Sequence, residues 1–167
     1  MRPMIRGTIY RRGGRLIDAR LISPRQRPDK RIVGTSRNQG YKRKRPALVP
    51  LAHLLLNGPH NVYDIDGTLV TPPVDRSKVA VLGFFNGWPL PKKPYTGRVV
   101  PGADGKFEWE IRSANGNLVW SSHNQGYNRA GKVRADGTVA KGTALASLVE
   151  ICHGNGHEVD DKLHTAE

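Results

Sequence analysis

The sequence predicts an α+β protein made of two diverged tandem β-β-β-α units, with an antiparallel or mixed sheet, one helix per unit and an irregular connection rich in proline and glycine. The tetrapeptide Asn-Gln-Gly-Tyr occurs twice, at residues 38–41 and 124–127. Each copy follows segments that alternate apolar and polar residues, and each is followed by apolar residues at helical spacing. Similarity that extends on both sides of a short identity indicates a duplicated unit.

Residues 1–57 are predicted to form the first unit, which is strongly basic. Its helix is expected to start near Pro46, because Pro50 is tolerated only in a first turn, where no intrahelical donor is lost. Gly58 then stops the helix. The strands that precede this helix are expected at residues 6–12, 16–23 and 31–37.

Residues 58–104 are predicted to be a connecting segment with one or two strands. Only "SKVAVLGFF", residues 77–85, has the apolar density of a buried strand. The prolines that follow disfavour helix in the residues before them. The run "YTGRVV", residues 95–100, is expected to be a strand that leads into the second unit.

Residues 105–154 are predicted to form the second unit, and residues 155–167 a polar tail. Strands are expected at 106–113 and 117–123, joined by a turn at Asn115-Gly116, because Asn-Gly favours a two-residue hairpin. The insert "KVRADGTVAKG", residues 132–142, has an Asp-Gly centre that predicts a small extra hairpin. A helix is expected from Ala144.

The second unit resembles the YegP-like family of small bacterial and phage proteins. The resemblance implies a tandem repeat of strands ending in a helix, and it implies no activity, cofactor or site residue. The first unit matches the family pattern less closely and lacks the Ala-Asn-Gly turn. The pattern is carried by Phe107, Trp109, Ile111, Ala114, Asn115, Gly116, Leu118, Val119, Ser122, Gly126 and Tyr127.

Positive charge is concentrated in the first third of the chain. Residues 1–57 hold 15 basic and two acidic residues, while the remaining 110 residues hold 12 of each, so the whole net charge of +13 lies in the first unit. Twelve of the 15 are arginine, whose guanidinium forks suit phosphate oxygens. This asymmetry favours a polyanionic partner, either nucleic acid or an acidic protein, over a merely solvated surface.

The location of the protein is expected to be intracellular. No apolar run approaches the roughly 20 residues that cross a bilayer, and the N-terminal segment lacks the apolar stretch of a signal peptide. The single cysteine, Cys152, excludes an internal disulfide. We therefore expect a cytoplasmic protein without a membrane partner, and homodimerisation stays open. The resemblance to the YegP-like family implies that its source is a bacterial cell or a phage.

The loop "RNQGYKRKRP", residues 37–46, is the strongest binding candidate. Its cations surround one aromatic ring immediately before a helix, whose free N–H groups favour anions. The phosphates would be held by the cations while the tyrosine stacks on a base or sugar; alternatively, Tyr41 and Tyr127 pack between strand and helix in both copies. The predicted nucleic-acid site consists of Arg37, Tyr41, Lys42, Arg43, Lys44 and Arg45 with Arg11 and Arg12. The first expected function is thus a non-catalytic nucleic-acid-binding protein.

Two other functions remain open at this point. The first is a protein-interaction module, for example a phage-encoded inhibitor or assembly component that binds an acidic host protein. Its contact aromatics would be Phe84, Phe85, Trp88 and Trp120.

The second is a small phosphatase of the haloacid-dehalogenase type. The run "VYDIDGTLV", residues 62–70, matches the first motif of that class, with Asp64 as nucleophile and Asp66 as acid and base. Asp160 and Asp161 would be distant metal ligands. The alternative is a plain Asp-Gly turn of a hairpin, which we favour because no alternating βαβ pattern is present. Cys152, His153 and His157 lack a recognised zinc spacing, so no metal and no cofactor are predicted.

Overall fold

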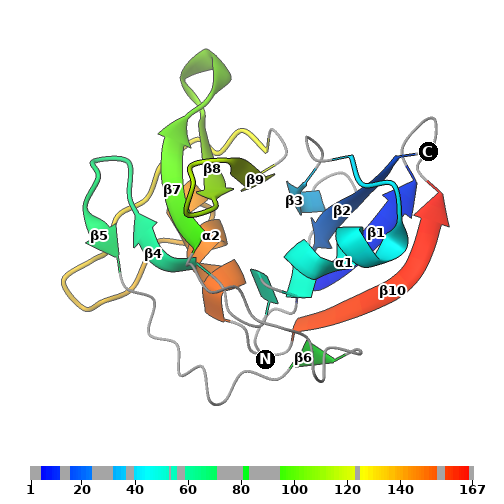
Figure 1. The fold of residues 1–167 in the computed structure, drawn as a ribbon. Coiled ribbons are helices and arrows are strands. Elements are labelled where there is room, and N and C mark those ends of the chain that lie inside the picture. The colour runs from blue at the N-terminus through cyan, green and yellow to red at the C-terminus, as the bar shows by residue number, and fades with distance from the viewer. Residues whose placement is uncertain are drawn as a thin grey trace.

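The computed structural model describes residues 5–11, 16–23, 32–36, 40–52, 54–55, 59–70, 81–82, 95–122, 125–153 and 157–165. These residues form ten strands and two α-helices (Figure 1). The strands of the first half and its helix are β1 Arg6–Arg11, β2 Ile17–Ile22, β3 Ile32–Thr35 and α1 Lys44–Ala52. The remaining elements are β4 Pro59–Tyr63, β5 Leu69–Val70, β6 Val81–Leu82, β7 Tyr95–Pro101, β8 Phe107–Arg112, β9 Leu118–Ser121, α2 Ala144–His153 and β10 His157–Thr165.

All ten described strands belong to one mixed sheet with the order β5-β4-β7-β8-β9-β3-β2-β1-β10-β6. The predicted fold class of two tandem β-β-β-α units is therefore wrong. An edge strand exposes backbone N–H and C=O groups that have no partner. Strands β3 and β9 would each be an edge strand of a separate unit, and here they pair with each other at Thr35 and Ser121. The strands outside the predicted units extend the same sheet, so the architecture is one large mixed sheet with two helices.

The segments between and after the expected units supply five of these strands. The predicted polar tail, residues 155–167, contains β10, which pairs in parallel with both β1 and β6. The predicted connecting segment, residues 58–104, contains β4, β5, β6 and β7. Parallel pairs β1/β10 and β4/β7 join residues far apart in sequence. Local patterns do not reveal such pairings, since they carry no information about which distant strand lies alongside.

Local sequence patterns predicted the individual elements better than they predicted the fold class. The Asn115-Gly116 turn is present, with Gly116 at φ 87° and the Gly116 N–H donating to the Ser113 carbonyl over 2.9 Å. Helix α1 begins at Lys44, two residues earlier than expected, and Pro50 lies inside the helix and not in its first turn. The expectation that Pro50 lies in the first turn was therefore wrong. Packing of the apolar face offsets the lost intrahelical bond, because Leu48 and Leu51 are buried.

One hydrophobic core lies between the helices and the sheet. Figure 1 shows α1 lying across β1 and β2, and α2 against β7 and β8. Glycines in the strands below allow both helices to approach closely. A Cβ on Gly7 would lie 2.7 Å from Leu51 Cδ2, and a Cβ on Gly97 would lie 3.2 Å from Leu148 Cδ1. Each glycine thus makes room for a leucine of the helix above it.

Candidate nucleic-acid interface

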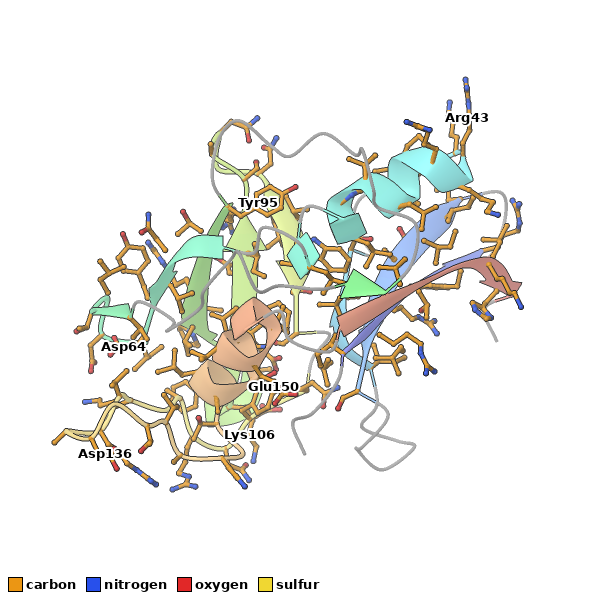
Figure 2. All side chains as sticks on the ribbon, turned by 90° about the horizontal axis from the view of Figure 1, so that it is seen from below. Arg43, Asp64, Tyr95, Lys106, Asp136 and Glu150 are labelled. Carbon is orange, nitrogen blue, oxygen red and sulfur yellow. The ribbon has the colours of Figure 1, made fainter. Side chains whose placement is uncertain are left out.

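Four consecutive cations, Lys42 to Arg45, stand at the start of α1, and we call them the basic segment. All four are exposed. Figure 2 shows the Arg43 side chain projecting from the beginning of α1 into solvent. Within the described part of the chain, no ion pair is found for Lys42, Arg43 or Lys44. These three positive charges are therefore available to a partner.

Backbone hydrogen bonds fix the position of the basic segment against the sheet. The Tyr41 N–H donates to the Ile17 carbonyl over 2.8 Å, and the Ile17 N–H donates to the Tyr41 carbonyl over 2.6 Å. Gly40 adopts a positive φ of 59°, which suits glycine, and its N–H donates to Asp18 Oδ1 over 3.0 Å. The chain is thus held at the start of β2 and turns directly into α1.

The electrostatics of this helix start favour an anionic ligand. The first turn of α1 contains no acidic residue. Cations at a helix N-terminus lie at the positive end of the helix dipole, where each costs about 0.3–1 kcal/mol when exposed. The N–H groups of a first turn also lack intrahelical acceptors. A bound phosphate would relieve the repulsion among the cations and accept hydrogen bonds from these N–H groups.

Arg11 lies at the same end of the sheet as the basic segment. It is the last residue of β1 and is paired with Ile17 of β2, which in turn pairs with Tyr41. Neighbouring strands are about 4.8 Å apart, so the backbones of Arg11 and Tyr41 are roughly 10 Å apart. Two other predicted site residues, Arg12 and Arg37, lie outside the described residues.

Sequence reasoning missed two basic side chains on β10. Lys162 and His164 are exposed, and β10 lies beside β1 with His164 opposite Tyr10 and Thr165 opposite Arg11. They therefore lie near the same end of the sheet as Arg11. The signal was weak, because "HEVDDKLHT" has few apolar residues and reads as a tail; the buried Val159 is its main apolar anchor.

Tyr41 is half-buried and packs against the hydrophobic core. Burial is the main cause that raises the pKa of its hydroxyl, followed by the nearby Tyr95 and Asp18. Tyr127 has the same local structure in the second copy: its N–H donates to the Phe107 carbonyl over 2.9 Å, and burial likewise raises its pKa. The alternative in which both tyrosines pack between strand and helix agrees with these contacts.

The two Asn-Gln-Gly-Tyr copies share further hydrogen bonds. The Gly126 N–H donates to Glu108 Oε2 over 2.7 Å, as the Gly40 N–H does to Asp18. Ser122 Oγ accepts from the Trp109 N–H over 3.1 Å, and Ser36 Oγ accepts from the Ala19 N–H over 2.9 Å. The copies differ after the tyrosine, where the second continues with Asn128, Arg129 and Ala130. The dense positive charge is therefore a property of the first copy alone.

The Asp64 to Thr68 stretch forms the turn of the β4/β5 hairpin, as the plain-turn alternative predicts. The Asp64 N–H donates to the Thr68 carbonyl over 3.0 Å, and the Gly67 N–H donates to the Asp64 carbonyl over 3.0 Å. Asp160 and Asp161 lie on β10, and six strands separate β10 from β4 in the sheet. Seven spacings between neighbouring strands correspond to about 34 Å along the sheet. These aspartates do not join Asp64 and Asp66 in one site, and no cluster of three potential metal ligands is found among the described residues.

Of the four aromatic residues expected to contact a partner protein, only Trp120 lies among the described residues. Trp120 is fully buried in the core, so its expected role as an exposed contact was wrong. Phe84, Phe85 and Trp88 lie outside the described residues, as do the side chains of Cys152, His153 and His157.

Comparison of the chain with protein-family models, with curated proteins and with solved structures found no significant match. The resemblance to the YegP-like family therefore stays a prediction. Neither described helix has the length and apolar character needed to cross a membrane.

Proposed function

We propose that this protein binds nucleic acid through the basic segment, Lys42 to Arg45, and contacts phosphates more than bases. The observation that carries this proposal is the exposure of four consecutive cations at the positive end of the α1 dipole. Cations at this position destabilise the free helix, and a bound anion would offset that cost. Binding of an anion therefore explains why the cations are placed there. Arg11 at the adjacent strand end extends the basic surface.

Contacts to the phosphate backbone suit this surface better than base reading does. Arginine and lysine side chains on an exposed helix start can follow a row of phosphates, which carry no sequence information. Tyr41, the aromatic residue expected to stack on bases, is half-buried against the core. Tyr41 therefore has a packing role, and the affinity for nucleic acid comes from the charges of the basic segment.

Direct binding of labelled nucleic acid tests the proposal. At about 50 mM salt, fluorescence anisotropy with a DNA duplex of about 20 base pairs should give a Kd of about 1 µM or tighter, because low salt strengthens nonspecific binding. A duplex of scrambled sequence should bind within about threefold. Single-stranded DNA and RNA of the same length identify the preferred form, and polyglutamate represents an acidic protein surface. Absence of binding to all the nucleic acids, or equal binding of polyglutamate, would contradict the proposal.

A further inference from the structure

A groove of about 680 Å³ lies on the opposite side of the molecule from the basic segment. Its walls are the β4/β5 turn and the hairpin at residues 132–139, where Val133 and Val139 pair, and Val149 of α2 also lines it. Figure 2 shows Asp64 and Asp136 on this flank, far from Arg43. A volume of about 300–1,000 Å³ is typical of sites for small organic molecules.

The apolar part of the groove is exposed to solvent. Leu69 and Val133, 52% and 42% exposed, are the large hydrophobic side chains left exposed among the described residues, and both line this groove. Val70, which also lines it, is buried. Exposed apolar side chains that converge on one concave surface gain free energy when a ligand covers them.

The polar part of the groove is a buried carboxylate with one oxygen unused. Asp64 is only 6% exposed. Its Oδ1 accepts the N–H groups of Asp66 and Thr68, each over 2.9 Å. No hydrogen bond to its Oδ2 is found from any described residue, although Asp64 lines the groove. Asp64 Oδ2 is therefore open to a hydrogen-bond donor of a ligand in the groove, because a carboxylate oxygen is an acceptor.

The charge of the groove is opposite to that of the whole chain. Three carboxylates, on Asp64, Asp66 and Asp136, line it together with one cation, Lys132. Lys132 Nζ lies 2.9 Å from Asp66 Oδ2, and both side chains remain more than half exposed. The remaining negative charge favours a cationic ligand in a protein whose net charge is +13.

We propose that this groove binds a small organic cation, an ammonium or guanidinium group on an apolar body. The cationic head donates a hydrogen bond to Asp64 Oδ2, and the apolar body covers Leu69 and Val133. The volume of about 680 Å³ between the two hairpins suits a small molecule. This site is independent of the nucleic-acid interface and shares no residue with it.

The test uses phenethylammonium as the probe and the full-length ¹⁵N-labelled protein. Amide signals of Gly67, Thr68 and residues 133–137 should shift during titration, with a Kd on the order of 1 mM, as expected for a ligand of this size. The neutral isostere 2-phenylethanol should bind at least about tenfold more weakly. No shift up to about 20 mM, shifts confined to other residues, or equal binding of the alcohol would overturn the proposal.

Asp64→Asn is the informative variant, because it keeps Oδ1 as an acceptor for the two N–H groups and removes the charge. It should weaken phenethylammonium binding about tenfold while the rest of the spectrum is unchanged. Asp104→Asn is the matched control, since Asp104 is an exposed carboxylate in a left-handed turn conformation, φ 57°, that asparagine also tolerates. Unchanged affinity in Asp64→Asn, or binding of a basic peptide without binding of the amine, would reject the assignment.

Discussion

Simultaneous replacement of Lys42, Arg43, Lys44 and Arg45 by glutamine should weaken binding to a DNA duplex by at least about 100-fold at about 50 mM salt. Each cation that neutralises a phosphate releases a condensed counterion, and this release supplies most of the affinity of nonspecific binding. Glutamine retains side-chain length and helix propensity, so charge is the main property that changes. Fluorescence anisotropy with the same duplex measures the loss.

The matched control removes four charges from the other half of the molecule. Lys106, Arg129, Arg134 and Lys141 are exposed, and their replacement by glutamine lowers the net charge by the same amount. This control should lose less than about fivefold in affinity. Similar losses in both variants would show that total charge, and not the basic segment, determines binding.

The same variant, with all four cations of the basic segment replaced by glutamine, should not lose thermal stability. Its Tm should equal or exceed that of the wild type, because cations are removed from the positive end of the α1 dipole, where each costs about 0.3–1 kcal/mol. A gain in stability together with a loss of binding would show that the basic segment is retained for a ligand. A lower Tm would indicate that these side chains stabilise the fold.

Trp109→Ala should lower the free energy of unfolding by about 3–5 kcal/mol, the usual cost of removing a large buried aromatic side chain. Trp109 is fully buried on β8, and its Nε1–H donates to Ser147 Oγ of α2 over 3.1 Å. Its ring also fills the space above β3, where a Cβ on Gly34 would lie 2.8 Å from Trp109 Cη2. The ring therefore contacts both halves of the sheet near the β3/β9 junction.

Urea denaturation followed by circular dichroism measures the effect of Trp109→Ala. For a slope of about 2 kcal/mol per M, the midpoint should fall by roughly 2 M. Ser147→Ala removes only the hydrogen-bond acceptor and should cost about 1 kcal/mol. Equal losses in the two variants would mean that the hydrogen bond, and not the volume of the ring, accounts for the contribution of Trp109.

The sequence located most strands of the two predicted units but not the architecture. The alternating pattern placed β8 well, because Trp109 and Ile111 are buried on one face and the side-chain period is two residues. The pattern also placed β2, although residues on both of its faces are buried. The same patterns could not show that β3 pairs with β9, or that β10 lies parallel to β1, since these contacts join distant residues. The polar sequence of residues 157–165 did not indicate a strand, although the backbone of β10 pairs with both β1 and β6.

The candidate sites were predictable to different degrees. The basic segment was visible in the sequence because charge density does not depend on tertiary structure. The role of Tyr41 depended on burial, which only the packing of the loop against the core determines. The groove beside Asp64 was not predictable, because it forms where two hairpins separated by some 60 residues come together. The Asp-x-Asp-Gly-Thr motif did single out Asp64 in the sequence, but it indicated phosphatase chemistry and not a ligand groove.

The salt dependence of binding tests the central proposal most directly. The logarithm of the association constant is plotted against the logarithm of salt concentration for the wild type and for the four-fold variant of the basic segment. We predict a slope of about −3 to −5 for the wild type, corresponding to four to six neutralised phosphates, and about −1 or shallower for the variant. A flat dependence in the wild type, or the same slope in both proteins, would contradict phosphate binding by Lys42 to Arg45.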